Sequence, residues 1–219
     1  MNRITLAVVA LMLLSMSILA SSTPARAGEP RTHDGFFLRL SAGAGSASAN
    51  LEDGSLGFPA DFKLSGVAGD ADIAIGGRIG DNLLLHGTLF SWAVVDPDAE
   101  VSALGQSSTD QVNGSVTMSA IGGGLTYYVM PSNLYFTGSL GMSSLDLTDN
   151  GNHLSSESGF AFTLGVGKEW WVGESWGLGV AGGFTYFTAK EKDILTGVLD
   201  SNESWSGPSY ALRFSATFN

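Results

Sequence analysis

The strongest constraint on this chain is an alternation of apolar and polar residues that returns in eight separate segments. In the last of them, residues 209–219, the apolar Tyr210, Leu212 and Phe214 alternate with polar residues such as Arg213. Successive side chains of a β-strand point to opposite faces, so this period of two predicts strands with one apolar and one polar face. The other seven segments occupy residues 35–45, 67–80, 82–94, 115–129, 134–143, 159–171 and 176–188.

The links between these segments alternate between short and long. Three links are short and consist mostly of turn-forming residues: "GDN" at 80–82, "MPSN" at 130–133 and "VGES" at 172–175. The other four run roughly over 46–66, 95–114, 147–158 and 189–208. A barrel with every short turn at one end and every long loop at the other produces this pattern. We therefore predict an all-β fold, an eight-stranded antiparallel up-and-down transmembrane β-barrel in which the last strand pairs with the first.

The first 27 residues have the pattern of a cleaved signal peptide. Arg3 precedes an apolar run at 4–20, and Ala25 and Ala27 form a small-residue cleavage site before Gly28. The alternative is a transmembrane anchor, for which a run of this length is at the bottom of the spanning range. We expect residues 1–27 to be a cleaved signal peptide, 28–33 a short N-terminal tail and 34–219 the barrel.

Composition excludes several classes of function. The chain has no cysteine, so disulfides, thiolate nucleophiles and cysteine-bound metals are excluded. Its formal net charge is −11, and because Arg3 and Arg26 are the only charged residues before Gly28, the remainder carries −13. Nucleic acid requires clustered Lys and Arg, so it is not an expected partner. No cofactor or metal motif is complete, and we expect neither.

Aromatic residues gather at the segment ends that meet the short turns. An outer-membrane barrel carries aromatic belts where its wall crosses the membrane surface. We therefore predict a periplasmic aromatic girdle, formed by Phe36, Tyr127, Phe136, Trp170, Trp176 and Phe218.

Charged residues collect on the opposite, inward face of the same segments. Eight strands leave a lumen that side chains can fill, and buried charges must be paired. We expect a charge network in the barrel interior, with Glu169 serving one or more of the arginines. Its members are Arg39, Asp70, Asp72, Arg78, Glu169 and Arg213.

With its signal peptide, eight amphipathic segments, alternating links and the ending "YALRFSATF", the chain resembles the OmpA/OmpX-like family of eight-stranded outer-membrane β-barrels of Gram-negative bacteria. The resemblance covers essentially all of residues 34–219. It implies export to the outer membrane, contact with outer-membrane lipid and lipopolysaccharide, and recognition of the terminal strand by the barrel-assembly machinery. The final residue here is Asn219, where that family's pattern has an aromatic residue.

Four functions are compatible with these features. The leading hypothesis is a non-enzymatic protein with four acidic extracellular loops and a structural or surface-interaction role, whose partner the sequence does not identify. A narrow pore for small solutes is the alternative, followed by a lipid-modifying enzyme and a soluble lipocalin-like barrel. The enzyme hypothesis rests on His153, Ser155 and Glu157, which fall in a predicted loop, where a solvated polar role is the simpler interpretation.

Overall fold

The computed structural model describes residues 33, 35–53, 60–103, 106–149, 152–156, 158–190 and 204–219. The predicted signal peptide and its cleavage site lie outside the described residues. Within these ranges the regular structure is entirely β-strand. A search of the same residues for a helix of membrane-spanning length and hydropathy found none.

Eight long strands form a closed antiparallel barrel. The strand β1 pairs with β2 on one side and with β11 on the other, from Leu38 opposite Phe218 to Leu51 opposite Trp205. The prediction that the last segment closes the sheet is therefore confirmed. The strands are β1 (Phe36–Asp53), β2 (Ala60–Gly80), β3 (Leu83–Val95), β6 (Gly114–Val129), β7 (Leu134–Asp149), β9 (Gly159–Trp171), β10 (Trp176–Lys190) and β11 (Ser204–Phe218).

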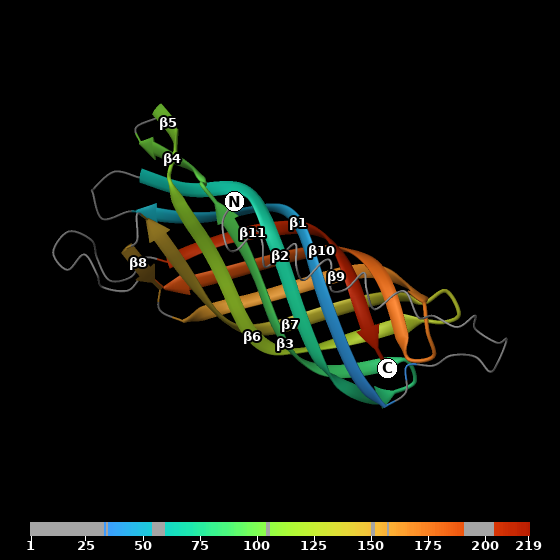
Figure 1. Ribbon diagram of the computed structural model, residues 1–219. Helices are drawn as coiled ribbons and strands as arrows, with labels where there is room; N and C mark the ends of the chain where they lie inside the picture. Colours follow the sequence, from blue (N-terminus) through green and yellow to red (C-terminus); the bar gives the residue numbers. More distant parts are fainter. Residues whose placement is uncertain are drawn as a thin grey trace.

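The two ends of the barrel differ, as the link lengths predicted. Short turns join β2 to β3, β6 to β7 and β9 to β10 at the end where the C-terminus also lies, which we call the turn end (Figure 1). Asn82 and Asn133 have left-handed backbone angles in two of these turns, with φ of 58° and 54°. The short strands β4 (Asp98–Ala103), β5 (Gln106–Gln111) and β8 (Asn152–Ser155) lie at the other end, the loop end.

The faces of the wall reverse their polarity along the barrel. Toward the turn end, apolar side chains such as Ile73 and Leu212 point outward, and the interior holds buried polar and charged side chains together with a small cluster of buried apolar and aromatic ones. Toward the loop end, apolar side chains point inward while Ser48 and Asn50 are on the outer face. The buried residues of this loop-end core include Leu51 on β1, Leu64 on β2, Trp92 on β3, Met118 on β6, Leu145 on β7, Phe187 on β10 and Trp205 on β11.

Strand length explains the reversal. A membrane-spanning strand needs about 9–11 residues, whereas β1 has 18 and β2 has 21. The excess length continues past the outward apolar band into water, where polar residues belong outside and apolar ones inside. The expectation of loops over all of 46–66 is therefore wrong, because β1 continues to Asp53 and β2 begins at Ala60.

Candidate functional site: the barrel interior

Five of the six predicted interior charges are buried inside the barrel. Arg213 on β11 binds Asp70 on β2 through two hydrogen bonds, with Nε donating to Oδ1 and Nη2 donating to Oδ2 at 3.0 Å. Arg39 on β1 lies 3.8 Å from Asp72 on β2, measured from Nε to Oδ1. Asp72 also accepts a hydrogen bond from Thr88 on β3 at 3.1 Å. The alternation along the strands thus brings two arginines and two aspartates into adjacent buried pairs.

Arg78 is the exception, and its assignment to the interior is wrong. Its side chain is 39% exposed and pairs with Asp81 in the turn that follows β2. Its Nε donates to the carbonyl oxygen of Gly80 at 3.1 Å. Arg78 is still in register opposite the buried Leu84, and the pairing of β2 with β3 shifts only between Arg78 and Gly80. The long side chain of Arg78 therefore leaves the strand at the end of the barrel, where it reaches the turn and Asp81.

Glu169 is inside the barrel as expected, but its hydrogen-bond partners are hydroxyl groups. Oε1 accepts hydrogen bonds from Tyr128 on β6 at 3.1 Å and from Thr217 on β11 at 2.6 Å. Its other carboxylate oxygen has no hydrogen-bond partner among the described residues. The expectation that Glu169 binds an arginine directly is not met in these contacts.

Arg39 also connects opposite walls of the barrel. Its Nη2 donates to Oγ1 of Thr137 on β7 at 3.2 Å, and the guanidinium carbon is 5.0 Å from the centroid of the Tyr135 ring. In the closed strand order, β1 and β7 are four positions apart in either direction. Thr137 continues the network through Thr126 at 2.9 Å to His86 at 3.0 Å. One polar network therefore spans the lumen.

A second contact between opposite walls lies in the loop-end core. Trp92 on β3 meets Phe187 on β10 edge-on, with ring centroids 5.5 Å apart. These strands are also four positions apart around the barrel. Both side chains are 2% exposed or less. Trp92 is also the cross-strand partner of Asp70, so this apolar layer directly adjoins the charged layer on its loop side.

His33 fills the mouth of the barrel at the turn end. Its ring stacks on Tyr128 with centroids 3.5 Å apart, and its exposure is 1%. Hydrogen bonds link Nε2 to Oδ1 of Asn133 at 2.7 Å and Nδ1 to Oδ1 of Asn219 at 2.9 Å. Sequence reasoning assigned His33 to the tail and missed this contact. The only sequence signal was an aromatic, hydrogen-bonding residue three positions before the first strand.

The predicted girdle residues point outward near the turn end. Phe36, Tyr127, Phe136, Trp170 and Trp176 are exposed, and Phe218 is half-buried between two of them. The centroid of its ring lies 6.2 Å from that of Phe36 and 5.3 Å from that of Trp176.

The residues of the enzyme hypothesis are not arranged as a nucleophile and its base in the part that is described. Ser155 donates its hydroxyl hydrogen to Asp146, and Glu157 lies outside the described residues. His153 belongs to β8, where its backbone pairs with Thr148. Within the described ranges, a search for groups of three or more metal-binding side chains found none.

Comparisons with known proteins found a matching family model and similar solved structures. A family model described as "Outer membrane protein beta-barrel domain" matches residues 6–215. Neisserial surface protein A superposes with a TM-score of 0.51 at 14% identity, over 84% of this chain and 97% of that one. OprG from Pseudomonas aeruginosa is 15% identical over 87% and 100% of the two chains, with a TM-score of 0.46. No curated protein matches the sequence significantly.

Proposed function

Because the chain belongs to the outer membrane protein beta-barrel domain family, we propose that it is a non-enzymatic outer-membrane protein with a closed lumen and a structural or surface-interaction role at its loop end. The family places the protein in the outer membrane, within a lipid and lipopolysaccharide environment. The finer role is argued from the interior and from the loop-end surface.

The observation that carries the proposal is the contact between opposite walls. Arg39 reaches Thr137 in the charged layer, and Trp92 reaches Phe187 in the apolar layer. A solute moving along the lumen would have to displace both contacts. Displacing the first leaves the Arg39 guanidinium buried with fewer partners, and displacing the second opens a gap in a packed core. Both changes cost free energy, which supports a lumen that is closed to solutes.

The loop end offers a surface for a partner. In the part of the chain that is described, β5 pairs only with β4, and every residue of β5 is exposed. An unpaired strand edge can accept an extended segment of another protein through backbone hydrogen bonds. Asp98 and Asp110 are exposed on this hairpin. We expect the extracellular partner to be uncharged or basic where it meets the hairpin.

The remaining proposals concern export and assembly. Residues 1–27 would be removed as a signal peptide, leaving His33 near the new N-terminus. The barrel-assembly machinery would read the final strand. Asn219 has a hydrogen bond to His33, and this contact supplies a structural role for the amide side chain at position 219.

Conductance measurements on refolded protein in planar bilayers test the proposal. Wild-type protein should show no steady conductance. The double variant Arg39→Ala/Trp92→Ala, which truncates one side chain in each layer, should show it. Ile75→Ala, on the exposed outer wall, is the control and should behave as wild type. Steady conductance of the wild-type protein would refute the closed lumen.

A narrow water-filled pore is the second candidate, because buried polar atoms in the charged layer lack partners. Arg39 Nη1, His86 Nδ1 and Glu169 Oε2 have no hydrogen-bond partner among the described residues. Water commonly satisfies such groups, and a chain of waters would provide a path for small solutes. Wild-type conductance that changes in Glu169→Gln would favour this candidate.

Mass spectrometry of lipid A from cells with and without the protein tests the enzyme alternative. We expect the acyl chains of lipid A to be unchanged, as for a non-enzymatic protein.

A further inference from the structure

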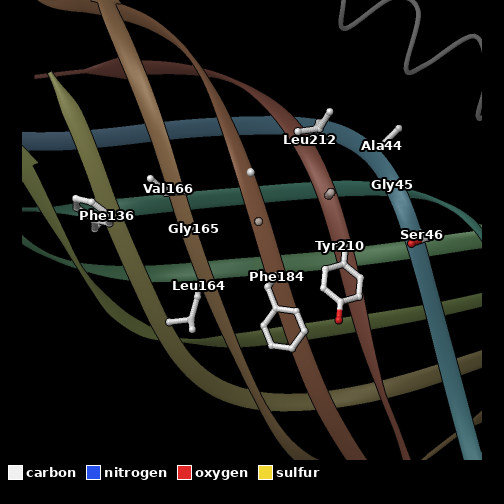
Figure 2. Close-up of a pocket in the computed structure, with 13 residues that line it drawn as sticks. Ala44, Gly45, Ser46, Phe136, Leu164, Gly165, Val166, Phe184, Tyr210 and Leu212 are labelled. Atoms are coloured by element: carbon white, nitrogen blue, oxygen red, sulfur yellow. The ribbon is translucent and has the colours of Figure 1, made fainter. Parts of the chain in front are cut away.

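The outer wall of the barrel carries a groove of about 750 Å³ that crosses β9, β10, β11 and β1 and is bordered by Phe136 of β7 (Figure 2). Its volume lies within the range of about 300–1,000 Å³ that is usual for sites of small molecules. Its principal side chains are apolar or aromatic and point away from the lumen. They are Leu164, Val166, Phe184, Tyr210 and Leu212, around the backbone of Gly182.

A glycine creates the floor of the groove. Gly182 occupies an outward position on β10, directly between Val166 on β9 and Leu212 on β11. A Cβ built on Gly182 would have no atom within 4 Å, so the missing side chain leaves open space. Leu212 stands beside it with 76% of its surface exposed. The hollow is therefore a property of the sequence at one position.

The next outward row forms a wall on the loop side. Phe184 lies between Leu164 and Tyr210, and its ring centroid is 5.2 Å from that of Tyr210. Figure 2 shows the two rings side by side on neighbouring strands. Ser46 of β1 is paired with Tyr210, so two residues with hydroxyl groups stand at this end of the groove.

The position of the groove along the strands indicates its depth in the membrane. Gly182 lies six residues beyond Trp176, and Tyr210 lies eight residues before Phe218, where both aromatic residues belong to the girdle. A strand crosses the membrane in about 9–11 residues. Both positions are therefore past the midpoint, in the leaflet on the loop side. In the outer membrane this leaflet contains lipopolysaccharide.

We propose that the groove is a binding site for one acyl chain of a lipopolysaccharide molecule. The chain lies over Gly182, between Val166 and Leu212. The hydroxyl end of the groove, at Tyr210 and Ser46, faces the polar ester region above it. Three features select this occupant: the apolar lining, the continuity with the lipid-facing wall, and hydroxyl groups only at the end nearer the loop side. The site does not depend on whether the lumen conducts.

The test is the lipid that remains on the protein after purification from its outer membrane in mild detergent, measured by native mass spectrometry. Wild type should retain one lipid A-containing molecule. Gly182→Leu fills the groove and should retain at least tenfold less. Gly87→Leu is the matched control, because Gly87 is exposed on β3 on the opposite wall and a Cβ there meets nothing closer than 3.9 Å. The control should retain lipid as wild type does.

A second pair of variants keeps the test decisive if Gly182→Leu does not fold. Leu164→Ala/Leu212→Ala removes two walls of the groove and adds no bulk, and Leu89→Ala/Leu125→Ala removes two exposed leucines elsewhere. Only the first pair should lose the lipid. Equal retention in both pairs would overturn the proposal. Two other results would also overturn it: phospholipid instead of lipid A bound to the wild-type protein, or a wild-type dimer that Gly182→Leu converts to a monomer.

Discussion

Replacing Arg213 by methionine should destabilise the barrel more than any change to a surface ion pair. The guanidinium binds both oxygens of Asp70, and the two side chains are 8% and 3% exposed. Arg213→Met leaves the Asp70 carboxylate buried without its cation. Breaking a buried pair in this way costs about 3–5 kcal/mol, most of which is the desolvation of the charge that remains.

The double variant Asp70→Ala/Arg213→Met separates the pair from the rest of the packing. It removes both charges, so no buried ion is left without a partner. Replacing a whole buried pair is often close to neutral, and we expect the double variant to be more stable than Arg213→Met by about 2 kcal/mol or more. Arg78→Met is the control, because the Arg78–Asp81 pair is exposed and should contribute about 0–1 kcal/mol.

Urea unfolding in lipid vesicles, followed by tryptophan fluorescence, measures these differences. With a slope of about 2 kcal/mol per molar urea, a loss of about 3–5 kcal/mol lowers the midpoint by roughly 1.5–2.5 M. If Arg213→Met and Arg78→Met lower the urea midpoint equally, the interior pair does not stabilise the barrel more than the exposed pair does. If the effects of Asp70→Ala and Arg213→Met add, the two residues do not form a coupled pair.

The remaining predictions use the same unfolding assay. Trp92→Ala opens a gap beside Phe187 and should cost about 3–5 kcal/mol; a cost below 1 kcal/mol would mean that the loop-end core is loosely packed. His33→Ala removes two hydrogen bonds and a stacked ring, so a loss of about 1–3 kcal/mol is expected, with little further loss when Asn219→Ala is added. Ile73→Arg places a charge on the lipid-facing wall and should cost about 2–4 kcal/mol, whereas Ser48→Arg, outward but beyond the apolar band, should cost almost nothing. Equal costs for these two variants would contradict the polarity reversal.

The barrel could be predicted from sequence because each membrane-spanning segment has its own alternation of apolar and polar residues. Alternation assigns Ile73 and Leu212 to the outer wall and Asp70 and Arg213 to the interior without knowledge of any partner strand. The short turns then set the direction of each strand. In the structure Ile73 and Leu212 are exposed, and Asp70 and Arg213 are buried. Pairwise contacts were less predictable, since Glu169 binds hydroxyls and Arg78, at the end of its strand, pairs with the turn residue Asp81.

The loop-end core was missed although the sequence contains its signal. In residues 46–51, "SASANL", the alternation continues without a break, but the apolar positions change from even numbers to odd numbers. Ala42 and Ala44 point outward, and Ala47 and Ala49 point inward. A strand whose apolar face stays outward would end at this change, so the residues beyond it were predicted to form a loop. The contact of His33 with Asn219 joins residues 186 positions apart, and nothing local indicates it.

The reversal of polarity also determines how strongly the charged layer is constrained. The ion pairs lie between the apolar layer of Trp92 and Phe187 on one side and the rings of Tyr128 and His33 on the other. These aromatic layers reduce the access of water, so the charges depend on each other for stabilisation. Opening either layer admits water to the pairs and lowers the cost of separating them. Arg213→Met should therefore destabilise the barrel less in a Trp92→Ala background than in wild type, and equal costs in the two backgrounds would show that the layers act independently.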